Sequence, residues 1–243
     1  MALEKTKGIV LHHIKYGDTS IIAYLYTEKF GRQAFMVNGA RSKKANLKAN
    51  LFQPLFVHNL EIYYNQKRDL QRIKELKNIK PFRTIPYDIV KNSISLFLAE
   101  VLYRCLREQE SGNQLFNFLL NSIELLDTLE EGAVNYHLLF LVQLSRFLGF
   151  YPNDNRSSDS EWFDLQDGNF CNSKPVHNHV INKDYLDLFD VLRNTSMTKP
   201  EALVLTKLQR DYLLDKLIEY YKLHLGHFGD IKSVEVLKTV FSG

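Results

Sequence analysis

The sequence has few cysteines and no long apolar run. Its 243 residues include only Cys105 and Cys171, which are too few for a disulfide framework. No apolar run approaches the length needed to cross a bilayer, and the N-terminal segment MALEKTKG lacks a signal-peptide pattern. These absences favour a cytoplasmic protein without membrane segments. Cys105 lies in an apolar helical pattern, so we expect a small buried residue there.

The motifs of common enzyme classes are also absent. There is no GxxxxGKS or GxxxxGKT loop and no GxGxxG after a strand, so nucleotide binding has no support. Neither HExxH nor GxSxG occurs. Carboxylates such as Asp18, Glu61 and Glu75 are scattered among basic residues, with no apolar setting for an acid–base pair. The sequence therefore predicts a protein that is not an enzyme and needs no cofactor.

The charges are distributed unevenly. Residues 1–80 carry 15 basic and 6 acidic residues, a net charge of +9, whereas the remainder carries 16 basic and 22 acidic residues. A basic first third is typical of a protein that binds a polyanion. A charged, solvated surface without a partner is the alternative that charge alone leaves open.

The first third of the chain reads as short strands. Apolar, β-branched or alternating stretches occur at residues 8–14, 20–27, 33–37, 60–65 and 70–76, with Gly and Asp turns between several of them. Five short strands in about eighty residues predict a small barrel, and a five-stranded OB-fold is the natural candidate.

Helical spacing begins at Pro86, which suits a first helical turn. Further helices are predicted from Ser111 or Asn113 to Gly132, over residues 133–148 and 183–193, after Pro200, and over residues 233–241. The chain is thus predicted to be α+β. An OB-fold domain at 1–80 precedes an all-helical domain at 81–243, which carries an irregular insertion at about 151–182.

His177 and His179 lie near Cys171 and are the candidates for part of a metal site. A structural zinc site needs four ligands, usually with paired cysteines two to four residues apart. Cys171 has no such partner, so we expect no metal and interpret the two histidines as exposed loop residues. Packing of Trp162, Phe163 and Phe170 against the helices is expected to hold the insertion together.

Several segments in sequence order resemble the RecO family of bacterial recombination mediators. The segment GARSKKANLKANLFQPLF at residues 39–56 resembles the basic loop that follows the family's third strand. Residues 8–11 with Tyr16-Gly17-Asp18 resemble its opening strand and turn, and Phe30-Gly31-Arg32 its next hairpin. Leu148-Gly149-Phe150 with Pro152 resembles the end of the central helix. Residues 231–237 resemble the C-terminal signature.

The resemblance implies an N-terminal OB-fold followed by a helical domain. It also implies binding to single- and double-stranded DNA, annealing of complementary strands, and help in loading a recombinase. The implied partners are RecR and the acidic C-terminal tail of single-stranded DNA-binding protein. We expect a monomer when alone, associated with the nucleoid. Many members carry a four-cysteine zinc module after the central helix, but here residues 172–179 replace its other ligands after Cys171.

Basic residues near the predicted barrel loops are the candidate DNA contacts. The first cluster is Arg41, Lys43, Lys44 and Lys48; the second is Lys67, Arg68 and Arg72; Lys15 and Arg32 are expected to extend the same face. Tyr16 and Phe30 sit at turns and remain candidates for base stacking, whereas Phe35 is expected to pack in the core.

For the partner tail, Arg146 near the end of the central helix is the first candidate, because arginine can meet a carboxylate through two hydrogen bonds. Lys91 and Arg104 on the preceding helix are alternatives. A simple helix-end role for Arg146 is equally open. Two other functions also remain open: an OB-fold RNA-binding protein, and an adaptor whose basic barrel docks an acidic protein.

Overall fold

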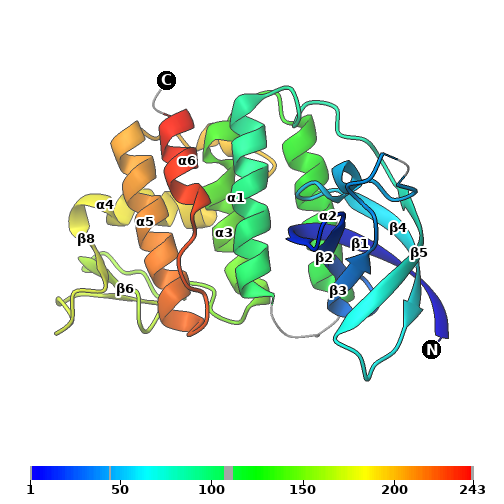
Figure 1. The fold of residues 1–243 in the computed structure, drawn as a ribbon. Coiled ribbons are helices and arrows are strands. Elements are labelled where there is room, and N and C mark those ends of the chain that lie inside the picture. Colours follow the sequence, from blue (N-terminus) through cyan, green and yellow to red (C-terminus); the bar gives the residue numbers. More distant parts are fainter. Residues whose placement is uncertain (1, 44, 107–111, 242–243) are drawn as a thin grey trace. The chain divides into compact units, whose positions relative to one another are not determined.

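Five strands close into a barrel in the N-terminal part of the chain (Figure 1). The computed structural model describes residues 2–43, 45–106 and 112–241. The barrel order is β1-β2-β3-β5-β4, with β3 and β5 parallel and the other pairs antiparallel. The strands are β1 (Ala2–Tyr16), β2 (Ser20–Thr27), β3 (Gly31–Val37), β4 (Val57–Tyr64) and β5 (Leu70–Asn78). This arrangement confirms the predicted α+β class and is consistent with an OB-fold.

Strand β1 is longer than the predicted segment at residues 8–14. Its first half pairs with β4 and its second half with β2, with a bulge between Val10 and His12. The charged residues before Gly8 hide this half from a search for apolar runs, and Thr6 is the one buried residue among residues 2–7. A strand that passes from one neighbour to the other is what allows five short strands to close.

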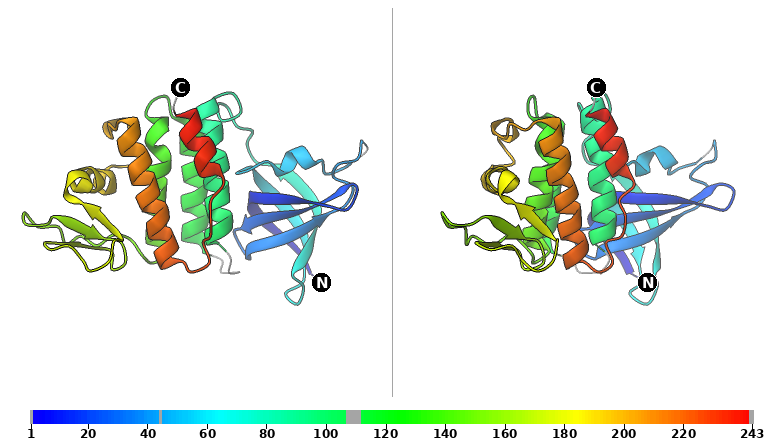
Figure 2. Two further views of the ribbon diagram at one scale, coloured as in Figure 1. Left: turned by 60° about the vertical axis from the view of Figure 1, so that its left-hand side comes forward. Right: turned by 90° about the vertical axis from the view of Figure 1, so that its left-hand side faces the viewer.

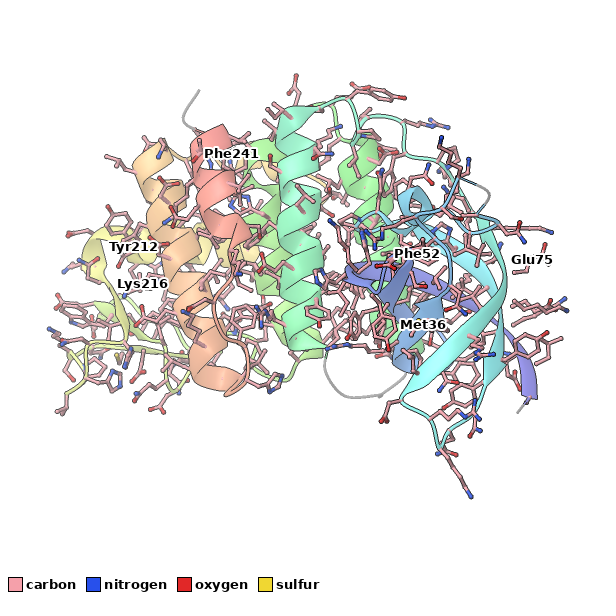
Figure 3. The ribbon with its side chains drawn as sticks, viewed as in Figure 1. Met36, Phe52, Glu75, Tyr212, Lys216 and Phe241 are labelled. Carbon is pink, nitrogen blue, oxygen red and sulfur yellow. The ribbon has the colours of Figure 1, made fainter. Side chains whose placement is uncertain are left out.

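The interior of the barrel is filled by alternating apolar residues. Phe35 is fully buried there, as predicted. Phe52, in the short 3-10 helix η1 (Ala49–Phe52), is also fully buried in the same core (Figure 3). Leu55 follows with a left-handed backbone (φ 63°) and a fully buried side chain. Burial of Leu55 holds a conformation that leucine rarely adopts.

Helices α1 (Ile89–Cys105) and α2 (Asn113–Thr128) follow the barrel. The compact unit Met1–Asp127 contains the barrel, α1 and nearly all of α2. Tyr26 of β2 stacks on Phe116 of α2, with ring centres 6.3 Å apart. Pro86 does not lie in the first turn of α1, contrary to prediction. The helix begins later because the Asp88 side chain caps it, accepting from the backbone N–H groups of Val90 and Lys91.

The second unit spans Thr128–Gly243. Its helices are α3 (Tyr136–Phe147), α4 (Lys183–Asn194), α5 (Lys207–His224) and α6 (Ser233–Val240), with 3-10 turns η2 (Ala133–Asn135) and η3 (Pro200–Ala202). Every residue from 136 to 142 is buried, so α3 is the central helix of this unit, as predicted. The Tyr221 hydroxyl of α5 donates to the Leu141 carbonyl of α3 at 2.7 Å.

The predicted irregular insertion contains a small sheet, so this prediction is wrong in part. Strands β6 (Trp162–Asp164), β7 (Asn169–Cys171) and β8 (Val180–Asn182) pair antiparallel in the order β7-β6-β8 (Figure 2). Three-residue strands are too short to show alternation in the sequence. Phe163 lies against Phe170 and Phe189, with ring centres 5.0 and 4.6 Å away. The predicted packing is confirmed for Phe163 and Phe170, whereas Trp162 is only half-buried.

Among the described residues, no helix is both long enough and apolar enough to span a membrane.

Candidate nucleic-acid interface

The basic segment after β3 begins with a tight turn. Gly39 adopts a left-handed backbone (φ 66°), and the Ser42 N–H donates to its carbonyl at 2.9 Å. The Ala49 N–H then donates to the Ala40 carbonyl, also at 2.9 Å. These bonds close residues 40–49 into a loop, which carries Lys43 and Lys48 exposed to solvent. Lys44 lies outside the described residues.

Two histidines anchor the end of this loop to the barrel. The His58 Nε2–H group of β4 donates to the Leu51 carbonyl at 2.7 Å, and Nδ1 of His13 on β1 lies 3.0 Å from the Phe52 carbonyl. Burial lowers the pKa of His58, outweighing the bond to Leu51, so its ring is neutral near pH 7. The segment that carries the exposed lysines is therefore fixed at its downstream end.

Arg41 fixes the loop to the turn between β1 and β2. Its Nη2 atom donates to the carbonyls of Gly17 and Asp18 at 2.7 and 2.6 Å, and its backbone N–H donates to the Thr19 carbonyl at 2.8 Å. This turn follows directly after the exposed Lys15 at the end of β1. Arg41, Lys43, Lys48 and Lys15 are thus brought to one end of the barrel, and their contact with DNA stays a prediction.

Arg72 approaches the same loop through strand pairing. In the parallel pair of β3 and β5, Arg72 is the register partner of Met36 (labelled in Figure 3), and its side chain is exposed. A groove of about 410 Å³ opens beside this pair. Loop residues Ser42, Ala45 and Asn46 line it together with Arg72. Arg72 therefore belongs with the loop, not with its sequence neighbours Lys67 and Arg68.

Lys67 and Arg68 lie elsewhere, in the hairpin between β4 and β5. The Asn65 side chain and carbonyl accept from the backbone N–H groups of Lys67 and Arg68 at 3.0 Å, which forms the turn. Both side chains are exposed. The hairpin projects away from the loop at residues 40–49 in all three views (Figures 1 and 2). The predicted second cluster is therefore divided between two places.

The cations of the barrel differ in how they are compensated. Six of them, or of the residues that follow directly, form ion pairs with acidic residues: Lys5–Glu61, Lys7–Glu28, Lys29–Glu4, Lys74–Glu61, Lys77–Glu75 and Lys80–Glu124. Within the described ranges, no ion pair involves the following side chains: Lys15, Arg41, Lys43, Lys48, Arg72, Lys67 and Arg68. The uncompensated positive charge is thus concentrated on the loops and on the adjoining ends of β1 and β5.

Arg32 has a different role from the predicted DNA contact. Its Nη1 atom donates to the carbonyls of Tyr103 and Leu106 at 3.1 and 3.2 Å. Its guanidinium lies 4.4 Å from the centre of the Tyr103 ring and 5.1 Å from that of Tyr24. The carbonyls at the end of α1 bear partial negative charge and accept from this cation. We therefore exclude Arg32 from the candidate interface.

Lys91 is buried, which corrects its prediction as a partner contact. Its exposed fraction is 4%, and its Nζ atom donates to the Thr84 hydroxyl at 2.8 Å. Asp127 accepts from the backbone N–H groups of Arg83, Thr84 and Ile85 beside it. Lys91 thus compensates a buried carboxylate. The other alternative, Arg104, is half-buried on α1, and its part in binding a partner stays a prediction.

Arg146 is exposed in the last turn of α3, as its prediction requires. Its guanidinium lies 4.1 Å from the centre of the Tyr151 ring. The neighbouring Phe147 is 38% exposed. This end of α3 therefore carries an exposed cation against an aromatic ring, and the next residue along the helix is a partly exposed apolar one.

The residues at the zinc-module position do not fit a zinc site. His177 Nε2 lies 3.3 Å from an Asp164 oxygen, and His179 Nδ1 lies 2.6 Å from a Glu219 oxygen. The Cys171 thiol is directed at the Trp162 carbonyl, and burial raises its pKa, which disfavours the thiolate that binds metal. No three His, Cys, Asp or Glu residues of the described chain form a group that could hold a metal ion.

No pattern in the sequence indicates the groove beside Arg72. Met36, Leu47 and Ile73 form part of its lining although they are far apart in the chain. Only the parallel register of β3 and β5 brings them together, and such a register is not readable from hydrophobic patterns.

Comparison with known proteins identifies the family. The family model for the N-terminal part of recombination protein O matches residues 1–82. The model for its C-terminal part matches residues 86–234. The chain is 41% identical over 240 residues to DNA repair protein RecO of Phocaeicola vulgatus. This match covers 99% of this chain and 100% of that protein. It is 43% identical over 240 residues to DNA repair protein RecO of Bacteroides fragilis, with 98% and 99% covered. Against DNA repair protein RecO of Flavobacterium psychrophilum it is 36% identical over 240 residues, again with 98% and 99% covered. The chain therefore belongs to the RecO family of DNA repair and recombination proteins.

Proposed function

We propose that this chain is a recombination mediator that binds single- and double-stranded DNA without catalysing a reaction. The observation that carries the proposal is the concentration of uncompensated cations at one end of the barrel. We call Lys15, Arg41, Lys43, Lys48 and Arg72 the loop-end cations. Their charges are held close together by backbone hydrogen bonds and strand pairing, an arrangement that favours a polyanion as ligand.

Annealing follows from this kind of binding. Phosphate contacts release counterions and carry no sequence information, so two complementary strands can bind and exchange partners on the same surface. Neutralising phosphates lowers the repulsion between the strands as they approach. Lys67 and Arg68 on the separate hairpin offer a second contact for a longer strand.

The end of α3 is the proposed contact for the acidic tail of single-stranded DNA-binding protein. An acidic tail with apolar terminal side chains requires a cation and an apolar surface side by side. Arg146 and Phe147 supply them, and the Tyr151 ring supports the guanidinium. Binding the coating protein at one place and DNA at another would, together with RecR, bring a recombinase to coated strands.

An annealing assay with strands coated by single-stranded DNA-binding protein tests the proposal. We expect this chain to accelerate annealing and the double variant Lys43→Gln, Lys48→Gln to do so less. The matched control is Lys5→Gln with Lys77→Gln, because both of these lysines are paired with carboxylates. No acceleration by the unaltered chain would contradict the proposal. If the loop-end cations bind RNA more tightly than DNA, the result would instead support an RNA-binding protein. If they bind an acidic peptide more tightly than either nucleic acid, it would support an adaptor.

A further inference from the structure

The groove beside β3 and β5 arises where the two strands separate. Their parallel pairing covers Ala34–Met36 and Leu70–Arg72. From Ile73 onward β5 pairs only with β4 among the described strands, and Ile73 and Lys74 at this unpaired edge line the groove. The loop that follows β3 closes the far side, with Ser42, Ala45 and Asn46 in the lining.

The lining combines apolar and polar residues. Met36, Leu47 and Ile73 provide apolar surface, and the side-chain amides of Asn38 and Asn46 provide hydrogen-bond donors and acceptors. The volume of about 410 Å³ lies within the range of about 300–1,000 Å³ usual for pockets that hold small organic ligands. A planar heterocycle with polar edges is the kind of group that matches this combination.

The charge around the groove favours a ligand that carries phosphate. Lys74 at the rim is engaged by Glu61 at 2.8 Å, whereas Arg72 forms no ion pair among the described residues. Lys43 is exposed on the loop between the lining residues Ser42 and Ala45. A ligand in the groove would therefore contact the cation of Arg72, and Lys43 lies on the loop segment that borders the groove.

A row of outward-facing residues leads away from the groove across the barrel. The strand register places Ile22 opposite Met36, Met36 opposite Arg72, and Arg72 opposite Tyr63. Tyr63 is 36% exposed. Neighbouring unpaired bases can lie on such a surface, because aromatic and apolar side chains accept the face of any base.

We propose that the groove holds one unstacked base of a single-stranded nucleic acid, with its flanking phosphates at Arg72 and Lys43. The inference rests on the proposed DNA-binding function and specifies how single strands are bound. A base in a duplex is stacked and paired, so it cannot enter the groove without being extruded. The groove therefore contributes affinity for single strands only, whereas the loop-end cations serve both forms.

The test is binding of the full chain to a single strand that carries 2-aminopurine, whose fluorescence rises when the base leaves its stack. We expect a rise with the unaltered chain. In Ala45→Phe, which fills the groove without changing charge, we expect no rise and about a tenfold loss of single-strand affinity, the order of one base contact. Duplex affinity should not change. The control, Asn50→Phe, places the same side chain at an exposed position of the same segment outside the groove lining.

The outcomes separate the two proposals. If the unaltered chain binds no DNA, the proposed function is wrong. If the unaltered chain binds DNA, but Ala45→Phe lowers the affinities for single strands and duplex equally or lowers neither, the proposal of a base in the groove is wrong. The proposed function then stands. Should Ala45→Phe fail to fold by circular dichroism, Asn46→Leu removes one amide from an exposed position, and we expect a weaker fluorescence rise with unchanged duplex affinity.

Discussion

Arg32 contacts Tyr103 in two ways. It donates to the Tyr103 carbonyl at 3.1 Å, and its guanidinium lies 4.4 Å from the centre of the Tyr103 ring. One side chain of β3 thus holds the C-terminal end of α1 by a hydrogen bond and a cation–π contact at once. This relationship turns a predicted DNA contact into a stabilising residue. Arg32 and Arg72, on the neighbouring strands β3 and β5, are therefore expected to respond differently to the same substitution.

Arg32→Gln should lower the free energy of unfolding by about 1–3 kcal/mol, because two carbonyl hydrogen bonds and the ring contact are lost. Urea denaturation measures this. Arg72→Gln is the matched variant: its side chain is exposed and unpaired among the described residues, so stability should hold while DNA affinity falls. Equal loss of stability in both variants would contradict the assignment.

DNA binding should weaken steeply with salt. If all five loop-end cations meet phosphates, the log–log salt slope for single strands is expected near −3.5, from about −0.7 per phosphate. Lys43→Gln with Lys48→Gln should reduce the slope to about −2.1. These lysines are preferred to Arg41, whose loss would also break its bonds to Gly17 and Asp18. An unchanged slope would remove the loop from the interface.

His137 should make stability depend on pH. Burial, and secondarily Arg210, lower the pKa of His137 to about 3, whereas the unfolded residue titrates near its ordinary value of 6.5. Its contribution to stability is therefore complete above about pH 6.5 and is lost as the pH falls, at about 1.4 kcal/mol per pH unit. His137→Leu should reduce the slope of unfolding free energy against pH by that amount. Denaturation between about pH 5 and pH 7 measures it, with exposed His227→Leu as the control.

The insertion should depend on an arginine–aspartate network instead of zinc. Asp190 accepts from Arg156 at 2.8 Å and from Arg193 at 2.9 Å. Burial alone would raise the pKa of Asp190, but these arginines hold it below its usual range. Asp190→Asn should increase proteolysis at residues 153–182 and lower stability by about 1–3 kcal/mol. A chelator should change neither. One zinc per chain by elemental analysis, lost together with structure, would contradict this.

Arg146→Ala should weaken binding of a peptide that copies the tail of single-stranded DNA-binding protein. Arg146→Lys keeps the charge but not the two parallel hydrogen bonds, so we expect intermediate affinity. Fluorescence anisotropy with a labelled peptide measures both variants. Equal affinity of all three proteins would leave Arg146 with only its helix-end role and its contact with Tyr151, and the search would then turn to Arg104.

The order of elements was predictable because it depends on local patterns. Alternation and helical spacing are properties of neighbouring residues, and they predicted five strands and the later helices. Elements stabilised by distant contacts were missed. The small sheet around Phe163 has strands of three residues, and it is held by Phe189, which lies beyond the sheet in the sequence.

The candidate site was only partly predictable for a related reason. Exposed cations in one loop, such as Lys43 and Lys48, are recognised from sequence because nothing buries them. Arg32 and Lys91 are as basic in the sequence as those lysines, and only the fold shows that Arg32 is bonded to the Tyr103 carbonyl and that Lys91 is buried against Thr84. Charge patterns reveal which residues are basic, but not which of them already have partners.

The stack of Tyr26 on Phe116 limits where the chain can be cut to give a stable fragment. A fragment that ends after the last barrel strand would leave Tyr26, now 1% exposed, and the guanidinium of Arg32 facing water without their helical cover. Such a fragment is expected to aggregate or to open along β2 and β3. Residues 1–127 form the compact unit that keeps this helical cover. Limited digestion should therefore release a resistant product that retains both α1 and α2, and truncation studies of the barrel should begin from that product.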